Sequence, residues 1–446
     1  MKIVIAGGGS IGYHLAKLLS LENQDITVIE NDQAVIENIS IKLDVMSVLG
    51  DATSIATLTE ANVKNADLYI TVTTSEGTNL LSAILAHQLG AKHTIARVNN
   101  PEFLSEDQKT YFKTIGIDKI ISPQQLAANE ILRLVKRSSL TDILNFEDGE
   151  ISIAGFTVDD DSKLVDKTVS QLGDELNGIE HRAVALLRNH NTQIPKSHTK
   201  LQKGDHVYLS IKTKHLDLLN PFLGKESKPI KNIMIIGDSD LSLKTAELLQ
   251  DNYQVILVIQ DENLGNYFLK HLSKTLVIIG DPNNKELLEQ EGIDNMDAFI
   301  ALSQNSEINI LTSLLAEEFG VYKTIAYVDN EVYTHISQSI GIDTIINKKL
   351  IAANYIFRFV RKGNIKVIAT LHGVAAEVIE YQITKSNRIT SHTLGELHLP
   401  DSCVVAGVVR DNQSIIPNDD FLLQKLDKVI ILAMPNAINK IEAIFR

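Results

Sequence analysis

The residues with the clearest chemical potential lie within the first twelve positions. Gly7, Gly9 and Gly12 have the G-x-G-x-x-G spacing, between an apolar run at residues 2–6 and a helix-like run at residues 13–19. In a strand–turn–helix unit the first glycine permits the tight turn and the second lets a pyrophosphate approach the backbone. The third allows the helix to pack closely on the strand. This spacing predicts a phosphate-binding site on free N–H groups at the helix start, although glycines also make ordinary strand–helix turns.

An acidic residue follows at the distance that such a site requires. Residues 25–29 form a second apolar run, and Glu30 stands at its carboxyl end. An acid about 20 residues after the glycines accepts hydrogen bonds from the hydroxyls of an adenosine ribose. No Lys or Arg occurs at residues 31–36, so a ribose 2′-phosphate would meet Glu30 and Asp32 without a counter-charge. The pattern favours NAD or an adenine nucleotide over NADP. The alternative interpretation is a solvated acid at a strand end.

The elements that must position these residues alternate between strands and helices. Further strands are expected at residues 45–49, 68–72 and 94–98, with a short sixth strand near residues 117–121. Helices are expected around residues 54–60, 79–89 and 123–137. This alternation predicts an α/β fold with a parallel, doubly wound sheet, in which ligands bind at the carboxyl ends of the strands. More polar candidates lie near these ends: Asp51, Thr73, Thr74 and, inside the fifth strand near the same edge, Arg97.

Composition limits the classes of function. A chain of 446 residues can form about three or four domains, and its hydrophobic content of 44% is ordinary for a globular protein. A net charge of −14 argues against nucleic-acid binding, which needs clustered Lys and Arg. The single cysteine, Cys403, excludes an internal disulfide and indicates a reducing compartment. Its apolar surroundings in the sequence favour a buried small hydrophobe over a catalytic thiol.

No segment of the sequence has the character of a leader or a membrane span. The first expected strand begins at residue 2, and no apolar run approaches the roughly 18 residues that cross a bilayer. We therefore expect a cytoplasmic protein that reaches the inner face of a membrane only through a partner.

The second half of the chain repeats the first, at an offset of 230 residues over its early part, as from Gly7 to Gly237 and from Thr94 to Thr324. Between the copies, residues 141–224 have short apolar runs and polar turns that predict a small α+β domain, and residues 225–229 have the composition of a linker. The small domain recurs near the end of the chain, where Ile416-Pro417 matches Ile194-Pro195. The expected domains are Rossmann-like at residues 1–138 and 229–362, and small α+β at residues 139–226 and 363–446.

The two copies differ where a nucleotide would bind. Four positions change between the first copy and the second: Gly9 to Ser239, Gly12 to Ser242, Glu30 to Gln260 and Arg97 to Tyr327. A serine at the third glycine position adds a Cβ where helix and strand should touch, and Gln260 lacks an anionic acceptor for a ribose. We therefore expect one competent nucleotide site per chain, in the first half.

With the duplication and the glycine motif established, the chain resembles the TrkA family. Proteins of that family are peripheral, cytoplasmic, NAD-binding subunits of bacterial potassium transporters. They carry two tandem RCK units (regulators of potassium conductance), each a Rossmann-like domain followed by a small C-terminal domain. The resemblance covers essentially the whole chain. Its marks include Gly7-Gly8-Gly9-Ser10-Ile11-Gly12, Val28-Ile29-Glu30, Gly50-Asp51-Ala52-Thr53, Thr78-Asn79 and Thr94-Ile95-Ala96-Arg97-Val98.

The resemblance implies a role for each candidate residue. The diphosphate would be bound by Gly7, Gly8, Gly9, Ser10 and Ile11, with Gly12 completing the motif. Glu30 would hold the adenosine ribose, and Asp51 and Ala52 would face the adenine. Thr73 and Thr74 would line the phosphate or ribose pocket, and Arg97 would reach the nucleotide. The ligand would be NAD(H) or ATP/ADP. The partner would be a Trk-type potassium-translocating membrane protein, on which a homotetramer of this chain forms a ring of eight RCK units.

The expected function is a ligand-driven switch without catalytic or metal-binding residues. An NAD-dependent oxidoreductase is the alternative, because Rossmann domains are common in enzymes. A dehydrogenase needs an acid/base and substrate anchors facing the nicotinamide. The histidines of the first small domain are instead scattered, without zinc-site spacing, at positions 181, 190, 198, 206 and 215. The run Asp159-Asp160-Asp161 lacks the spacing of a calcium-binding EF-hand loop.

Overall fold

The computed structural model describes residues 1–20, 24–137, 139–146, 150–159, 162–176, 178–189, 191–223, 228–329, 333, 342, 344–360, 365–370, 374, 376–385, 388–411 and 413–445. Among the sequence predictions, the linker at residues 225–227 and the side chains of Asp160, Asp161 and His190 lie outside these residues. The chain forms two compact units: Met1–Ala128 with Asn347–Val360, and Asn129–Ile346 with Arg361–Arg446.

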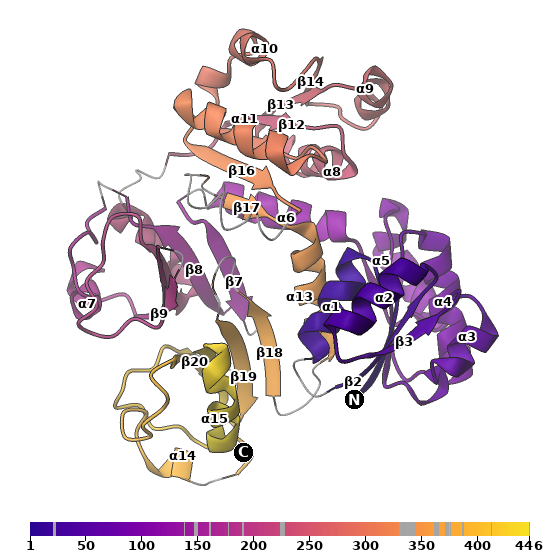
Figure 1. The fold of residues 1–446 in the computed structure, drawn as a ribbon. Helices are drawn as coiled ribbons and strands as arrows, with labels where there is room; N and C mark the ends of the chain where they lie inside the picture. The colour runs from indigo at the N-terminus through magenta and orange to yellow at the C-terminus, as the bar shows by residue number, and fades with distance from the viewer. Residues whose placement is uncertain are drawn as a thin grey trace. The chain divides into compact units, whose positions relative to one another are not determined.

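The first unit is built on a six-stranded parallel sheet with the order β3-β2-β1-β4-β5-β6. Residues 1–128 of this unit are drawn in indigo to purple in Figure 1. Its strands are β1 (Lys2–Ala6), β2 (Asp25–Glu30), β3 (Met46–Leu49), β4 (Leu68–Thr71), β5 (Thr94–Arg97) and β6 (Lys119–Ile121). The strand order reverses between β1 and β4, which is the point where such sheets bind ligands. This order is the Rossmann arrangement, and it confirms the predicted doubly wound parallel sheet.

Helices pack on this sheet and end where local chemistry requires. They are α1 (Ser10–Ser20), α2 (Gln33–Lys42), α3 (Ile55–Glu60), α4 (Glu76–Leu89) and α5 (Glu106–Thr114); the next helix, α6 (Pro123–Lys136), begins in the first unit and ends in the second. The hydroxyl of Ser54 accepts a backbone N–H at the start of α3, and Ser75 does the same for α4. Gly90 ends α4 with a φ of 115°, a left-handed conformation that glycine adopts without strain. Helix α5 was not predicted.

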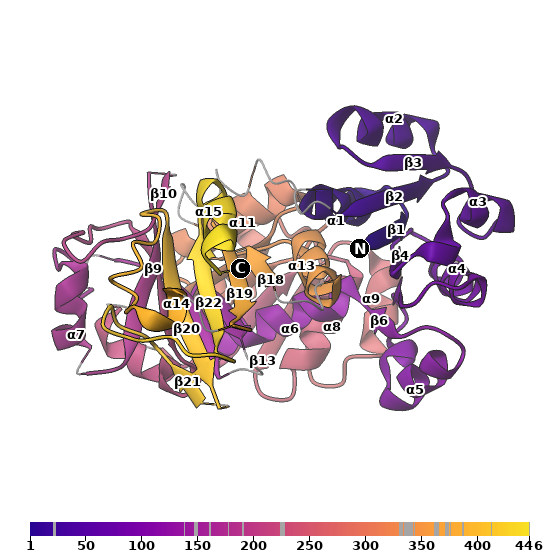
Figure 2. The same ribbon diagram turned by 90° about the horizontal axis from the view of Figure 1, so that it is seen from below.

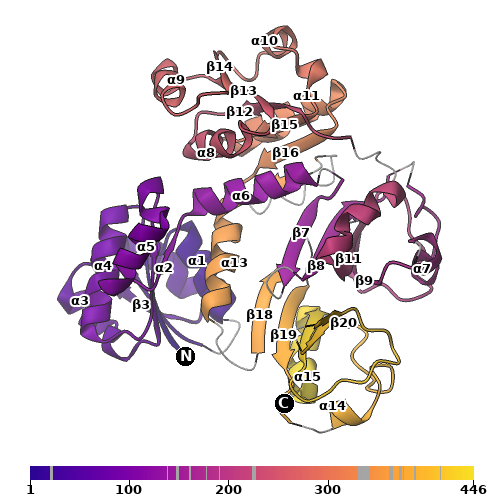
Figure 3. The same ribbon diagram turned by 180° about the vertical axis from the view of Figure 1, so that it is seen from behind.

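A helix from the second half of the sequence completes the first unit. Helix α13 (Lys348–Val360) packs against α1, and the two lie side by side in each view (Figures 1, 2 and 3). Lys119 of β6 lies over the ring of Tyr355 on α13, with its amine 5.6 Å from the ring centre. The helix that follows the glycine motif is therefore in contact with the segment that leads toward residues 363–446.

The second unit contains the repeated parallel sheet, with the order β14-β13-β12-β15-β16-β17. Its strands are β12 (Asn232–Ile236), β13 (Gln254–Ile259), β14 (Leu276–Ile279), β15 (Ala298–Ala301), β16 (Lys323–Tyr327) and β17 (Thr344–Ile346). Its helices are α8 (Asp240–Leu249), α9 (Glu262–Leu269), α10 (Lys285–Gln290) and α11 (Ser306–Glu318). The two sheets have the same strand order, which confirms the predicted duplication.

Two five-stranded antiparallel sheets make up the small domains, and both belong to the second unit. The first has the order β10-β9-β11-β8-β7, from β7 (Asp142–Phe146), β8 (Ile151–Thr157), β9 (His181–Arg188), β10 (Asn191–Gln193) and β11 (His206–Lys212). The second has the order β18-β19-β22-β20-β21, from β18 (Ile365–Thr370), β19 (Glu377–Gln382), β20 (Cys403–Arg410), β21 (Gln413–Ile415) and β22 (Lys428–Ala433). Short helices α7 (Leu172–Glu175) and α14 (Arg388–Ser391) and the longer α15 (Pro435–Phe445) accompany them.

The two small sheets share one apolar core. Side chains of the first sheet such as Ile153 and Tyr208 pack in the same buried cluster as Val404 and Leu432 of the second. Strand β9 contacts β20, and the two sheets lie next to each other in Figures 1 and 3. The predicted domain boundaries fall at or beside residues outside the described part of the chain, so their positions stay predictions.

Candidate functional site

The sequence-predicted site residues gather at one edge of the first sheet. Gly7 follows β1 directly, Glu30 is the last residue of β2 and Arg97 is the last residue of β5. Asp51 and Thr73 each come two residues after the strand before them. Because all six strands are parallel, these positions share the carboxyl edge, on either side of the point where the strand order reverses.

At two positions of the motif, the packing of the protein leaves no room for a side chain larger than that of glycine. Gly7 has a φ of +106°, and a Cβ there would lie 2.9 Å from the backbone nitrogen of Thr73. A Cβ on Gly12 would lie 1.8 Å from the carbonyl oxygen of Gly7, far inside van der Waals contact. A Cβ on Gly9, by contrast, would meet no protein atom within 4 Å. The space beside Gly9 is therefore open to a bound group.

The start of helix α1 has backbone N–H groups that the residue before it, Gly9, cannot cap with a side chain. The carbonyl of Gly9 accepts the first helical hydrogen bond, from the N–H of Tyr13 at 2.8 Å. Gly9 has no side chain that could accept an N–H of the first turn, and no side chain in the described part of the chain accepts one. Ser10 is exposed, whereas the side chain of Ile11 is buried and only its backbone can serve a ligand. An anion at this helix end is favoured by the N–H groups and by the helix dipole.

The carboxylate of Glu30 is bound to the backbone of its surroundings. One oxygen accepts the N–H of Gly8 at 2.7 Å, and the other accepts the N–H groups of Asn31 at 2.7 Å and Asp32 at 3.1 Å. The hydrogen bond between Gly8 and Glu30 thus holds the glycine loop that follows β1 against the end of β2. A carboxylate has about four acceptor positions, so Glu30 retains capacity for a hydroxyl donor.

Arg97 places a positive charge at the same edge. Its side chain is half-buried, and burial lowers the pKa of its guanidinium, which nevertheless stays protonated. No hydrogen bond or ion pair joins this guanidinium to another residue in the part of the chain that the structure describes. A half-buried cation without a counter-charge favours binding of an anion.

One residue that organises this edge had no role in the sequence prediction. The buried side chain of Asn79 accepts the N–H of Thr73 at 2.9 Å and donates to the carbonyl of Arg97 at 3.0 Å. The second copy repeats both bonds, from the N–H of Ser303 at 2.9 Å and to the carbonyl of Tyr327 at 2.8 Å. The repetition of this asparagine at position 309 was the signal that could have identified its structural role.

The remaining candidates have mainly structural contacts. Asp51 accepts the N–H and the hydroxyl of Thr53, each at 2.8 Å, and these bonds lower the pKa of its carboxyl. Asp281 makes the same turn with Asn283 in the second copy, so the turn itself accounts for this acid. Ala52 is buried in the core, where its carbonyl accepts a hydroxyl, and Thr74 is exposed.

In the second copy, serine side chains cap the helix that corresponds to α1. Gly237 keeps a φ of +119°, but Ser239 caps α8 by accepting the N–H of Ser242 at 3.2 Å. The same Ser239 hydroxyl donates to the carbonyl of Leu302 at 2.8 Å. The serines that replace Gly9 and Gly12 therefore bind each other and the end of β15, rather than leaving open space.

Charge at the second edge also opposes an anion. Asp238 and Asp240 flank Ser239 at the positions of Gly8 and Ser10. Tyr327, which replaces Arg97, donates its hydroxyl to Asp329 at 2.7 Å. Two carboxylates replace uncharged residues and a cation is lost, so a phosphate would meet net repulsion there.

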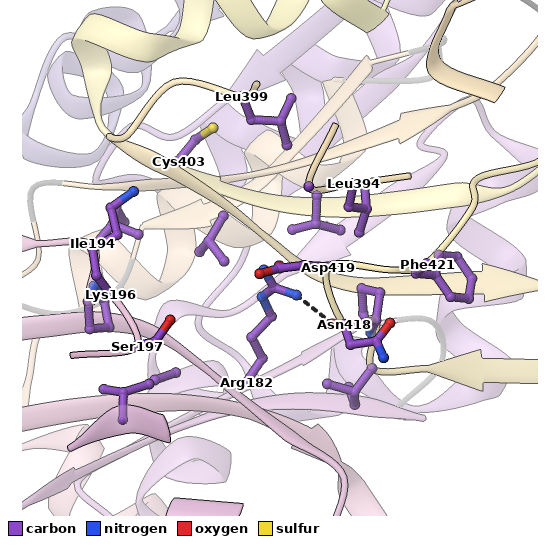
Figure 4. A pocket seen from close by; sticks show the side chains of 18 of the residues that line it. Arg182, Ile194, Lys196, Ser197, Leu394, Leu399, Cys403, Asn418, Asp419 and Phe421 are labelled. Carbon is purple, nitrogen blue, oxygen red and sulfur yellow. Dashed lines mark hydrogen bonds and ion pairs between the residues drawn. The ribbon is translucent and has the colours of Figure 1, made fainter. Parts of the chain in front are cut away.

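A separate cavity of about 950 Å³ lies between the two small domains (Figure 4). Arg182 projects into it, donating to the carbonyl of Pro417 at 2.6 Å and to the carboxylate of Asp419 at 2.7 Å. Lys196 is paired with Asp401 at 2.6 Å. Both cations come from the first small domain and both acids from the second. The charges therefore join the domains across the cavity and largely neutralise each other.

Burial shifts the pKa of two other titratable groups of the small domains, Cys403 and His181. Cys403 is buried, as expected, and burial raises the pKa of its thiol to about 11. Burial lowers the pKa of His181, whose ring contacts the carbonyl of Ile179 at 2.7 Å. Among the described residues, no cluster of three His, Cys, Asp or Glu side chains could hold a metal ion. No helix within the described ranges is long and apolar enough to span a bilayer.

Duplicated Rossmann-like sheets, each followed in sequence by a small antiparallel domain, define the class of this chain, and comparisons with known proteins agree. The TrkA-N domain model matches residues 3–123 and 233–348, and the TrkA-C domain model matches residues 153–224 and 378–446. The Trk system potassium uptake protein TrkA of Haemophilus influenzae is 30% identical over 452 residues, covering 100% of this chain and 99% of that protein. A TrkA homolog of Archaeoglobus fulgidus is 30% identical over 448 residues, with 100% of both chains covered.

Solved structures show the same fold. The GsuK channel bound to NAD matches with a TM-score of 0.62 and 16% identity, over 100% of this chain and 78% of that one. GsuK bound to ADP matches with a TM-score of 0.51 and 14% identity, over 80% of this chain and 68% of that one. The chain belongs to the TrkA family of Trk system potassium uptake proteins.

Proposed function

We propose that this chain is the regulatory subunit of a Trk-type potassium transporter and binds one NAD(H) or adenine nucleotide in its first Rossmann-like domain. The observation that carries the proposal is the contrast between the two sheet edges. The first combines a helix start at Gly9 that has no capping side chain, open space beside Gly9 and a guanidinium of Arg97 that has no hydrogen-bond or ion-pair partner among the described residues. The second is capped by Ser239 and carries additional acids.

The residues of the first edge fit the parts of a dinucleotide. The first-turn N–H groups of α1 would hold the diphosphate, and the open side of Gly9 would admit it. Glu30 would accept a ribose hydroxyl through the capacity that its three backbone donors leave free. Arg97 would approach a phosphate or the second ribose. Structures of GsuK with NAD and with ADP support both ligand classes.

Helix α13 supplies a path by which binding could alter the rest of the chain. A ligand shifts a conformational equilibrium only by its different affinity for two states. The nucleotide-binding end of α1 and the packed helix α13 belong to one compact unit, whereas the residues that follow α13 belong to the other. A small displacement of α1 on binding would thus be passed through α13 to the connection between units.

The partner and the assembly follow from family membership. We propose that four copies form a ring of eight RCK units on a Trk-type potassium-translocating membrane protein. This partner would hold the chain at the cytoplasmic face of the membrane. Nucleotide binding to the ring would open or close the ion path of that partner.

An NAD-dependent oxidoreductase remains the second candidate for a Rossmann-like fold. Such an enzyme requires a general acid or base beside the nicotinamide. Glu30, an acid at the carboxyl edge, is bound by three backbone N–H groups and lies where the adenosine ribose would be held. Incubating the full chain with NADH and candidate carbonyl substrates separates the classes, because a switch leaves the absorbance at 340 nm constant.

Potassium flux tests the proposed switch. The chain and its membrane partner would be reconstituted in vesicles, and flux would be measured with and without NADH or ATP. Glu30→Ala should abolish the nucleotide response, whereas the matched change Gln260→Ala in the second copy should preserve it. An unchanged response in Glu30→Ala, or equal loss in both variants, would contradict the proposal.

A further inference from the structure

Lys323 is a charged side chain in an unusual place. It is the first residue of β16 and is only 1% exposed, although lysines are almost never fully buried without a partner. Its amine donates to the carbonyl of Leu140 at 3.0 Å, on the connection between α6 and β7. A cation of the second Rossmann-like domain therefore ends inside the first small domain.

The surroundings of this amine form a buried polar cluster in the first small domain. Asp142, the first residue of β7, is 9% exposed. The ring of His206 contacts the hydroxyls of Thr141 at 2.9 Å and Thr157 at 3.3 Å. Burial lowers the pKa of His206 to about 4; the charge of Asp142 opposes this shift and that of Lys323 adds to it. At neutral pH His206 is uncharged, and the charged groups that act on its ring are Asp142 and Lys323.

The first copy lacks this arrangement. The position equivalent to Lys323 is His93, which is exposed and contacts Asp118 of its own domain at 3.3 Å. The buried cation is therefore not a requirement of the Rossmann-like fold. Lys323 also lies at the amino end of its strand, opposite the edge that corresponds to the nucleotide site. Its burial is explained by the contact between domains, and not by a remnant of ligand binding.

The cluster continues into the core that joins the two small domains. The rings of His206 and Tyr208 lie 5.0 Å apart. Tyr208 is fully buried in the apolar cluster shared with Val404 and Leu432 of the second small sheet. The division of the chain agrees with this continuity, because the second Rossmann-like sheet and both small sheets form one compact unit without the first sheet.

We propose that Lys323 locks the second Rossmann-like domain to the first small domain, so that these domains move as one body while the first Rossmann-like domain responds to nucleotide. The nucleotide response rests on the proposed function, but the lock does not. In this proposal the second Rossmann-like domain binds no nucleotide and instead serves as a fixed attachment to the first small domain.

Hydrogen exchange of the full chain tests the lock directly. Lys323→Met keeps the length of the side chain and removes the charge, whereas Lys323→Arg retains the charge. The Met variant should exchange at least about tenfold faster in both β7 and β16, while β1 and β4 stay within about twofold of the parent chain. The Arg variant should stay closer to the parent than the Met variant does. His93→Met is the matched control and should leave β7 and β16 unchanged. Unaltered exchange in Lys323→Met, or acceleration confined to β16, would overturn the lock.

The parent chain provides a second measurement that needs no variant to fold. Addition of NADH or ADP should increase protection around Gly9 and alter exchange in α13, with β7 and β16 unchanged within about twofold. A change beyond twofold in only one of these two strands would overturn the lock, because β7 and β16 would then not behave as one body. Absence of any change around Gly9 would instead contradict the proposed nucleotide site, and the lock would still be decided by Lys323→Met.

Discussion

Replacing Gly12 with alanine should destabilise the first Rossmann-like domain even without nucleotide. The new Cβ would lie 1.8 Å from the carbonyl oxygen of Gly7 and 2.9 Å from its carbonyl carbon. An ordinary contact needs about 3.4 Å or more, so helix and loop must separate by more than about 1 Å. The obstructing atoms are backbone and cannot rotate away. Overpacking of this kind costs about 1–3 kcal/mol, which corresponds to a fall in Tm of about 2–12 °C for a domain of this size.

Gly9→Ser is the matched control within the same loop. Its Cβ meets no protein atom within 4 Å, and serine is a better helix cap than glycine, so stability should stay equal or rise by a few tenths of a kcal/mol. Both variants would be compared by calorimetry of the full chain without ligand. The same two variants should lose nucleotide affinity, but only Gly12→Ala should melt earlier. Parent-like melting of Gly12→Ala, or an equal fall in Gly9→Ser, would refute the steric argument.

Three further predictions concern buried polar groups. Asn79→Ala leaves three backbone groups without their partner and should lower the free energy of unfolding by about 2–4 kcal/mol in urea titrations. Asn309→Ala should do the same in the second copy, and losses under about 0.5 kcal/mol would contradict the bonding role. Asp205, 1% exposed, binds Arg188 through two hydrogen bonds, so Asp205→Ala should cost about 2–4 kcal/mol by the same assay, and a neutral change would show that the pair is dispensable. The pKa of His206 is about 4 in the folded chain and 6.5 in its ordinary state, so between these pH values the unfolded chain binds one proton more than the folded chain. The free energy of unfolding should therefore fall by up to about 3 kcal/mol as pH drops from 6.5 to 4. His206→Gln should flatten this pH dependence. Identical pH slopes for His206→Gln and the parent would argue against that assignment.

The sequence predicted those secondary-structure elements that are determined by residues close together in the chain. The six strands of each Rossmann-like sheet are short apolar runs, and a buried parallel strand requires little more. Helix α5 was missed because, of its nine residues, only Phe112 is buried, which leaves no apolar periodicity to detect. Strand β7 was missed because its five residues include Asp142 and Asn145, polar types that are uncommon in strands.

The features missed at the site depend on tertiary contacts. Glycine spacing predicted the loop, but not that Gly8 donates to Glu30 or that Asn79 joins the ends of two strands. The serines of the second copy could be identified as substitutions, whereas their hydrogen bonds to each other and to Leu302 depend on how β15 and α8 pack in the fold. The packing of α13 on α1 was equally hidden, because sequence order assigns α13 to the second copy.

Calorimetric titration of the full chain with NADH or ADP is the most direct test of the central claim. We predict one site per chain, an at least tenfold weaker affinity in Glu30→Ala and an unchanged affinity in Gln260→Ala. A tenfold change corresponds to about 1.4 kcal/mol of binding free energy. Two equivalent sites per chain, or parent-like binding by Glu30→Ala, would contradict the assignment of a single site to the first glycine loop.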